Sequence, residues 1–160
     1  MKVLSLFDGI SCGYLALRRA GIPIDTYYAS EIDKTCIKVS QKHFPNIIQL
    51  GDVNNWRTWD IPWKDIDLVM GGFCCQSFSS SGKGKGFMDA RGRLFFRFSD
   101  IVRYLKKETK GKILFLDENV RMRDEHRRVI TEELGVEPVE IDSALVSAQT
   151  RHRLYWCNWP

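Results

Sequence analysis

The sequence lacks several features that would assign a chain to a class at once. No apolar run approaches the roughly 20 residues that a membrane-spanning helix requires. The apolar start, residues 1–7, is too short for a secretion signal and runs into an acidic residue. The five cysteines show no Cys-x-x-Cys spacing, so neither a disulfide framework nor a metal site is indicated. No internal repeat is present. These absences favour a cytoplasmic protein that binds no membrane and no metal.

What is present fits one globular domain. The chain has 160 residues, of which 44% are hydrophobic and 28% charged, as in ordinary soluble domains. We therefore treat residues 1–160 as a single unit with a substantial core. The net charge of +4 permits a polyanionic partner without requiring one.

Short apolar runs alternate with helical segments along the whole chain, which predicts an α/β fold with a mostly parallel, twisted sheet and helices on both faces. The expected strands are 3–7, 26–30, 47–50, 68–70, 112–116, 137–141 and 154–159. The expected helices are 14–20, 34–42, 93–105 and 124–134.

Polar residues follow the first three expected strands. The small residues of the turn 8–13 suit a nucleotide-type site, although the full Gly-x-Gly-x-x-Gly pattern is missing and a plain strand–helix corner is the alternative. Glu31 suits the two hydroxyls of a ribose and Ile32 a purine face; the alternative for Glu31 is a charge at a helix start. Asp52 follows the third strand in the same way. These side chains predict a ligand site at one edge of the sheet.

The fourth strand ends in two glycines and a thiol, which is how an α/β protein presents a nucleophile at the mouth of a cleft. We predict Cys75 as this nucleophile, with Cys74 as the alternative. Glu118 and Asn119 follow the fifth strand and are expected to face Cys75. Arg151 and Arg153, two residues apart on an extended segment, would point into one site and suit a carbonyl or a phosphate; a solvated basic patch is the alternative.

Two further segments carry weaker signals. The loop 79–86 is rich in serine, glycine and lysine, which suits a cover over a polyanionic ligand or a solvated linker. Trp56, Trp59 and Trp63 are predicted to pack against the core rather than to form a base-stacking platform, because we find no basic residues interleaved with them.

Together these segments resemble the DNA (cytosine-5) methyltransferases of bacterial and phage type, which act in DNA methylation and restriction–modification. Six stretches match the family's motifs in order, namely Phe7-Asp8-Gly9-Ile10-Ser11-Cys12-Gly13, Glu31-Ile32, Asp52-Val53, Gly71-Gly72-Phe73-Cys74-Cys75-Gln76, Glu118-Asn119-Val120 and Gln149-x-Arg151-x-Arg153. The resemblance implies a Rossmann-like fold that uses S-adenosylmethionine.

The resemblance also implies a role for each matching position. Cys75 would attack C6 of a cytosine flipped out of double-stranded DNA, Glu118 would hold the edge of the base, and Arg151 and Arg153 would hold its carbonyl and the loop. The implied cofactor-binding set is Phe7, Asp8, Gly9, Ser11, Gly13, Glu31, Ile32, Asp52, Val53 and Gly72. The implied substrate-binding set is Gln76, Ser79, Asn119 and Gln149.

Three departures from the family pattern stand out. Cys74 replaces a proline that would stiffen the turn before the nucleophile. Asp117 occupies a normally apolar position and is expected to cost stability if buried without a partner. The sequence up to Pro160 does not contain the target-recognition domain or the two later motifs that follow in family members. We therefore expect weak activity alone or a second chain that supplies the rest, in a bacterium or a phage-infected cell. A non-catalytic binding module and an RNA cytosine methyltransferase are the alternatives.

Overall fold

The computed structural model describes residues 1–73, 78 and 86–159. Four residues singled out from the sequence lie outside the described residues: Cys74, Cys75, Gln76 and Ser79. Within the part of the chain that is described, no helix is both long and apolar enough to cross a membrane.

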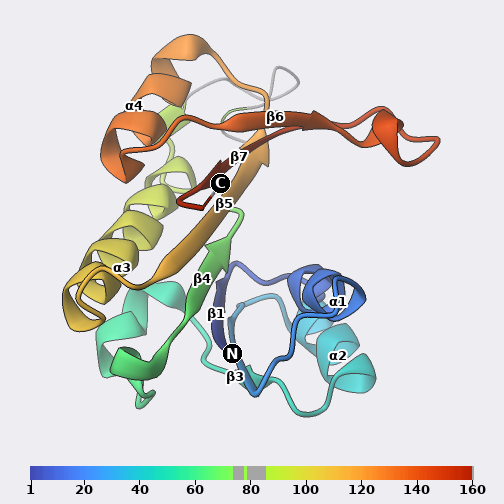
Figure 1. Ribbon diagram of the computed structural model, residues 1–160, viewed down its shortest axis with the longest axis vertical. Coiled ribbons are helices and arrows are strands. Elements are labelled where there is room, and N and C mark those ends of the chain that lie inside the picture. The colour runs from blue at the N-terminus through green and yellow to red at the C-terminus, as the bar shows by residue number, and fades with distance from the viewer. Residues whose placement is uncertain (74–77, 79–85, 160) are drawn as a thin grey trace.

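The centre of the structure is a seven-stranded sheet in the order β3-β2-β1-β4-β5-β7-β6 (Figure 1). The first five of these strands run parallel, and β7 runs antiparallel to both of its neighbours. The strand order reverses at β1, because β2 and β3 lie on one side of it and β4 and β5 on the other. The edge beyond the carboxyl ends of these strands is where open α/β sheets bind ligands. The strand bounds are β1 Lys2–Leu6, β2 Thr26–Ser30, β3 Ile48–Gln49, β4 Leu68–Gly71, β5 Leu114–Val120, β6 Val139–Asp142 and β7 His152–Cys157.

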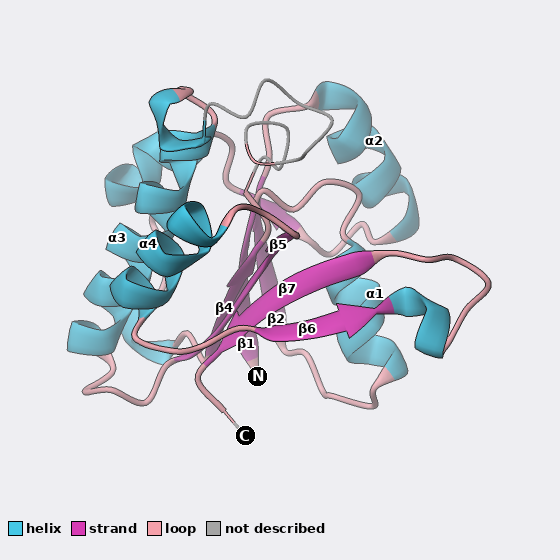
Figure 2. Ribbon diagram, turned by 90° about the horizontal axis from the view of Figure 1, so that it is seen from above, coloured by secondary structure: helices cyan, strands magenta, loops and turns pink. Residues whose placement is uncertain are grey.

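Helices cover both faces of the sheet, as the sequence predicts (Figure 2). On one face lie α1 (Cys12–Arg19) and α2 (Lys34–His43), and on the other lie α3 (Phe95–Glu108) and α4 (Asp124–Leu134). Among the described residues, short 3-10 helices lie in the connections: η1 Val53–Thr58, η2 Trp63–Asp65, η4 Gly86–Met88, η5 Gly92–Leu94 and η6 Ser143–Leu145.

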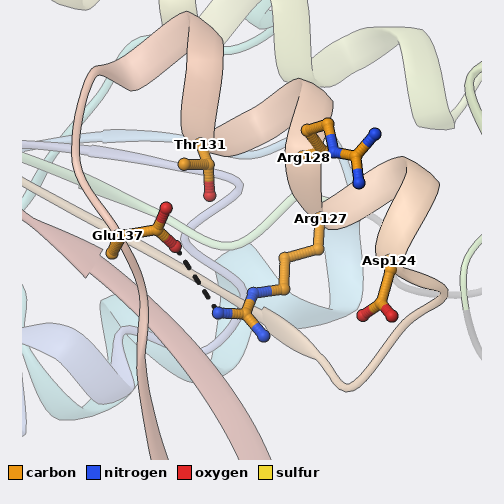
Figure 3. Close-up of a pocket in the computed structure, with 5 residues that line it drawn as sticks. All are labelled: Asp124, Arg127, Arg128, Thr131 and Glu137. Atoms are coloured by element: carbon orange, nitrogen blue, oxygen red, sulfur yellow. Dashed lines mark hydrogen bonds and ion pairs between the residues drawn. The ribbon is translucent and has the colours of Figure 1, made fainter.

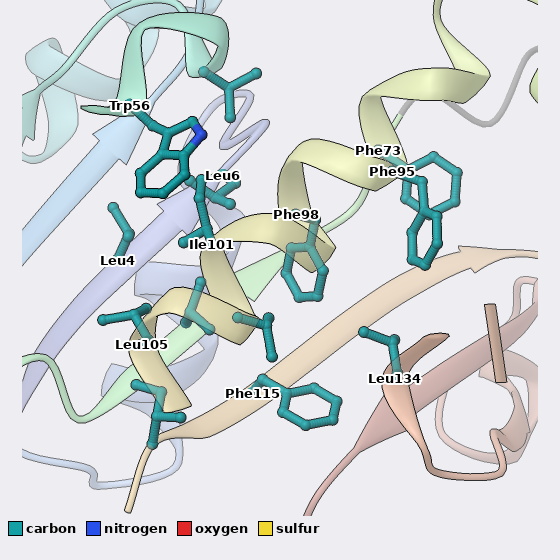
Figure 4. Packing of buried hydrophobic residues seen from close by; sticks show 14 of the residues in the cluster. Leu4, Leu6, Trp56, Phe73, Phe95, Phe98, Ile101, Leu105, Phe115 and Leu134 are labelled. Atoms are coloured by element: carbon teal, nitrogen blue, oxygen red, sulfur yellow. The ribbon is translucent and has the colours of Figure 1, made fainter. Parts of the chain in front are cut away.

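Alternation along the strands divides the core into two layers. Leu4 and Leu6 of β1 belong to the larger layer, which α3 fills with a stripe of large side chains that includes Phe98 and Leu105 (Figure 4). Val3 and Tyr27 belong to the smaller layer, against which residues of α1 pack. In each layer, apolar side chains of the sheet pack against those of its helices. Close packing of this kind holds the strand ends at the edge in fixed positions.

The structure corrects the predicted end of the fifth strand. The sequence suggests that the strand stops at Leu116, whereas β5 continues to Val120. The extension is stabilised by pairing with β7, which places Tyr155 opposite Glu118 and Arg153 opposite Val120. Glu118 is therefore a strand residue, and because successive side chains of a strand point to opposite faces, its neighbour faces the other way.

One half of one face carries exposed apolar side chains. Leu114 lies opposite Leu68, a member of the layer beside α1, and so belongs to the same face of the sheet. Leu114, Val139 and Ile141 expose 36%, 55% and 43% of their surface. Leu114 lies on β5 and the other two lie on β6, with β7 between them, so they are separate exposed apolar positions on one face of the sheet.

Candidate active site

A pocket of about 270 Å3 opens at the carboxyl edge, between the ends of β1, β2, β3 and β4. Six predicted cofactor residues line it: Phe7, Glu31, Ile32, Asp52, Val53 and Gly72. Its walls also contain Ser30, Asn54 and Leu94, which the sequence interpretation misses. The first two adjoin predicted residues, a signal that was available. Leu94 comes from the end of η5, and its sequence context carries no such signal.

Glu31 is held toward the first turn of the chain. Its Oε2 accepts a hydrogen bond from the Gly9 N–H at 2.8 Å, and its Oε1 accepts from the N–H groups of Ile32 and Asp33 at 2.7 and 2.9 Å. The start of α2 is capped by Asp33, whose side chain accepts from Thr35 and Cys36. Asp33 rather than Glu31 therefore caps α2, while Glu31 lies both at the start of that helix and in the pocket wall.

Four predicted cofactor residues build the first turn and are not among the residues that line the pocket, namely Asp8, Gly9, Ser11 and Gly13. Asp8 Oδ1 accepts from the Tyr27 hydroxyl at 2.8 Å, and its other oxygen accepts from the Ser11 hydroxyl. Burial raises the pKa of Asp8, although these hydrogen bonds oppose the shift. A Cβ on Gly13 would lie 2.6 Å from the Met70 Cε, so the end of that side chain would have to move. These residues fix the turn whose Gly9 N–H holds Glu31.

Asp52 connects the pocket to the face covered by α3. Its Oδ1 accepts from the backbone N–H of Asn54 at 2.9 Å and from the Asn54 Nδ2 at 3.0 Å, which caps the start of η1. Asn54 Oδ1 in turn accepts from the Arg97 Nε at 3.1 Å. A chain of hydrogen bonds therefore runs from the pocket wall to a helix of the opposite layer.

Glu118 lies beside the same pocket, packed against Gly72. A Cβ on Gly72 would lie 3.0 Å from the Glu118 Oε2 and 3.3 Å from its backbone oxygen, so a larger residue there would press on Glu118. Glu118 Oε1 forms an ion pair with the Arg153 Nε, 2.9 Å away. The Glu118 side chain is one-third exposed and that of Arg153 17% exposed, so the pair faces an accessible region without being fully solvated.

Asn119 has a different place from the one predicted. The resemblance implies a contact with substrate, but the structure buries Asn119 to 1% exposure on the opposite face of β5. Its Nδ2 donates to the Phe73 carbonyl at 3.1 Å, and its Oδ1 accepts from the Val120 N–H at 2.8 Å. The side chain thus fixes the backbone that directly precedes residues 74–77. Phe73 itself is buried and packs edge-on against Phe78, with ring centroids 5.4 Å apart.

Asp117 confirms the expectation of a costly carboxyl group. It is fully buried, and neither of its oxygens has a hydrogen-bond partner among the described residues. Burial raises its pKa well above the usual value, and the charge of Glu118 adds to the shift. Because a buried charge without a partner is strongly disfavoured, the environment favours the neutral form of the group.

The two predicted arginines separate in the structure. Arg153 lies in β7 and reaches Glu118, whereas Arg151 precedes the strand and is exposed. The backbone N–H of Arg151 donates to Asp142 at 2.8 Å. Gln149 is also exposed and lies in the connection between η6 and β7, part of the hairpin that projects beyond the sheet in Figure 1. Of the arginine pair, Arg153 is the one that belongs to the Glu118 site.

A second hollow, of about 330 Å3, lies beside α4 (Figure 3). Arg127 crosses it to Glu137, with 3.5 Å between Nη2 and Oε2. Thr131 in its wall accepts a hydrogen bond from the Trp156 indole at 3.0 Å. None of the predicted site residues lines this hollow. In the described ranges, no group of three or more His, Cys, Asp and Glu side chains is placed to hold a metal ion.

The strand order, the antiparallel β7 and the pocket at the point where the strand order reverses define a Rossmann-like methyltransferase fold. The model of the family described as C-5 cytosine-specific DNA methylase matches residues 1–136, and the chain belongs to this family. Solved structures of similar fold include the Dnmt2 methyltransferase of S. pombe, with a TM-score of 0.66 and 18% identity. A DNMT2 mutant of Spodoptera frugiperda gives 0.68 and 21%. Each match covers 98% of this chain, and it covers 48% of the S. pombe chain and 49% of the Spodoptera frugiperda chain.

Curated relatives are closer in sequence than these structures. The type II methyltransferase M.NgoBV of Neisseria gonorrhoeae is 38% identical over 141 residues, which are 84% of this chain and 31% of the relative. The orphan methyltransferase M.SPRI of Bacillus phage SPR is 34% identical over 168 aligned residues, 97% of this chain and 37% of the relative. The chain thus spans about a third of the length of these relatives.

Proposed function

We propose that this chain is the catalytic part of an enzyme that methylates C5 of cytosine in double-stranded DNA. The observation that carries the proposal is the position of Gly72. This residue lines the predicted cofactor pocket, and it also lies against the carboxylate of Glu118. A site for the methyl donor and an acid for the target base therefore meet at one residue of the sheet edge.

The pocket residues fit S-adenosylmethionine. The cofactor combines a ribose, a purine and a positively charged sulfonium, and the pocket combines Glu31 and Asp52 with the apolar side chains of Ile32 and Val53. A carboxylate offers about four lone-pair positions. Three backbone N–H groups engage Glu31, so capacity remains for a ribose hydroxyl. Bound there, S-adenosylmethionine supplies an electrophilic methyl group.

The reaction needs a nucleophile because C5 of cytosine alone is too weak to take a methyl group. We propose that the target base is flipped out of the duplex and that the Cys75 thiolate forms a bond to C6. The electron pair displaced from the C5–C6 double bond makes C5 nucleophilic. Glu118 hydrogen-bonds the N3 and amino edge of the base. Once C5 carries the methyl group, loss of its proton restores the double bond and expels the thiolate.

Arg153 has two tasks in this proposal. Its Nε pairs with the Glu118 carboxylate, and its Nη1 donates to the His152 carbonyl at 2.7 Å, which leaves Nη2 for the carbonyl of the base. Asn119 holds the Phe73 carbonyl and thereby the segment that leads to Cys75. Arg153 of β7 and Asn119 of β5 thus position the acid and the segment that leads to the nucleophile.

We further propose that a partner chain supplies target recognition and covers the exposed apolar face of β5, β7 and β6. The exposed side chains of Leu114, Val139 and Ile141 support it. A non-catalytic binding module is the second candidate, and the Cys74 substitution in the turn is the feature that favours it.

The test is transfer of a labelled methyl group to duplex DNA, with and without a recognition domain added as a separate polypeptide. We expect weak transfer alone and stronger transfer in the mixture, abolished by Cys75→Ser and greatly reduced by Glu118→Gln. DNA that contains 5-fluorocytosine should form a stable adduct with Cys75. Normal cofactor binding without adduct or transfer would establish the binding module instead. Preferential transfer to RNA would overturn the assignment of the substrate.

A further inference from the structure

A pocket of about 510 Å3 lies away from the candidate active site, between η1, η2 and α3. Its aromatic walls are Trp56, Trp63 and Tyr104. The three rings contact one another, with centroids 5.6 Å apart for the two tryptophans, 5.3 Å for Trp63 and Tyr104, and 5.3 Å for Trp56 and Tyr104. Trp56 is buried, whereas Trp63 and Tyr104 remain partly exposed and accessible to a ligand.

Cations dominate the rim of this pocket. Arg57, Arg103 and Lys107 line it with a single acid, Asp100. Asp100 lies 3.9 Å from Arg103, which also pairs with Glu133, so Arg103 is largely neutralised. Arg57 and Lys107 are exposed, which leaves the rim positive.

Arg57 is already arranged for stacking. Its guanidinium carbon lies 4.2 Å from the centroid of the Trp56 ring. A guanidinium on an aromatic face is held flat and keeps its N–H edge free for an oxyanion. The sequence interpretation of these tryptophans is therefore only partly correct. Trp56 and Trp59 do pack in the core, at 3% and 8% exposure. Nevertheless, the basic residue Arg57 lies between these two tryptophans in the sequence, and its side chain stacks on the Trp56 ring.

Rings that are partly open and cations at the rim are the combination by which proteins hold single nucleotides and single strands. Stacking selects a planar base, and the cations select its phosphate. A volume of this size lies in the range of pockets that hold small ligands. We infer that this pocket binds a nucleotide, either free or as one unit of a single strand, at a site separate from the cofactor pocket.

The site also has a route to the cofactor pocket. The short helix η1 contributes Asn54 to that pocket and Arg57 to this one. Arg97 bridges the two from α3, because it donates to Asn54 and pairs with Asp100 at 3.3 Å. A ligand that contacts Asp100 would thus affect Arg97, which in turn contacts Asn54 in the wall of the cofactor pocket.

The test measures thymidine monophosphate binding to the full chain by calorimetry, with saturating S-adenosylhomocysteine to fill the cofactor pocket. Thymidine and inorganic phosphate serve as separate probes, and a pentathymidylate distinguishes a strand from a free nucleotide. We expect saturable binding of the monophosphate that exceeds either fragment by about tenfold or more, since a charge-assisted hydrogen bond contributes that much. Tighter binding of the pentathymidylate would identify a strand, and equal binding a free nucleotide; both support the site.

Arg57→Glu and Lys107→Glu should each weaken the monophosphate by about tenfold. Both side chains are exposed, so the variants are expected to fold, which the melting temperature checks. Lys112→Glu reverses an exposed lysine ahead of β5 and serves as the matched control, with no expected change. Absence of saturable binding would overturn the inference. So would phosphate alone binding as well as the nucleotide, or equal losses in Lys107→Glu and Lys112→Glu.

Discussion

Arg153 Nε lies 2.9 Å from Glu118 Oε1, across the antiparallel pair of β5 and β7. The two residues are diagonal neighbours on one face, because Arg153 lies opposite Val120 and Tyr155 lies opposite Glu118. The hairpin that ends in β7 thus brings a cation to an acid more than 30 residues earlier in the chain. The pair depends on the register of the two strands as much as on the residue types.

Replacing Arg153 by alanine tests the orienting role of this pair. The Arg153→Ala variant should transfer methyl groups about 10- to 100-fold more slowly, because a hydrogen bond to a charged group contributes about 1.5–3 kcal/mol. The measurement is single-turnover methylation with cofactor and DNA in excess. Arg128→Ala removes an exposed arginine of α4 and should leave the rate unchanged. Equal rates for wild type and Arg153→Ala would remove Arg153 from the site.

Asn119 gives a test that separates positioning from substrate contact. The Asn119→Ala variant leaves the Phe73 carbonyl without its donor and should lose about 1–3 kcal/mol of unfolding free energy. We expect kcat to fall while KM for DNA changes little, since the side chain is buried away from the open face. Urea unfolding and steady-state kinetics measure the two effects. A raised KM with unchanged kcat would instead support the predicted contact with substrate.

Asp117 predicts a pH-dependent gain in stability on removal of its carboxyl group. Its pKa is raised in the folded protein, so the folded state holds a proton that the unfolded chain releases near its usual pKa of 3.8. The stabilising contribution of that proton is fully present below about pH 4 and is lost as the pH rises through the folded pKa. Asp117→Leu should therefore stabilise the protein at pH 8, by about 1–3 kcal/mol, and by less at pH 4.5.

The comparison is made by urea unfolding of both proteins at the two pH values. Asp60→Leu changes an exposed aspartate and provides the control, with a difference that does not depend on pH in this way. If Asp117→Leu is less stable than wild type at pH 8, the carboxyl group has a stabilising hydrogen-bond or ion-pair partner in solution.

Arg97 links the cofactor pocket to α3, and its removal should weaken cofactor binding. In Arg97→Ala, Asn54 loses its 3.1 Å contact, and the cap on η1 loosens. An exposed contact of this kind contributes up to about 1 kcal/mol, so we expect the dissociation constant for S-adenosylhomocysteine to rise about two- to fivefold. Arg103→Ala is the matched control, because Arg103 also neighbours Asp100 on α3 without reaching Asn54. Equal effects of the two variants would count against the link.

Much of the cofactor pocket is predictable from the sequence because the ends of parallel strands meet at one edge. Glu31 and Asp52 follow strands that are evident from apolar runs, and the fold then brings them together. Leu94 is not predictable in this way, since its place in the wall depends on how η5 leads into α3.

The opposite facings of Glu118 and Asn119 also escape the sequence. The apolar run ends at Leu116, and only the ladder with β7 extends the strand through these two residues. Pairing with a segment so distant in the chain leaves no local signal. The aromatic pocket was missed for a similar reason: Trp56 and Tyr104 are far apart in the chain, and their contact is formed by packing of η1 against α3.

Gly72 has a consequence for how the site can vary. Its main-chain atoms line the predicted donor pocket and also lie against Glu118. Main-chain atoms in a sheet have no rotamers to change, so the spacing between donor and acceptor is set by the strand itself. A substitution that shifts the end of β4 will therefore change the donor pocket and the surroundings of Glu118 together. At this position neither can be altered without the other.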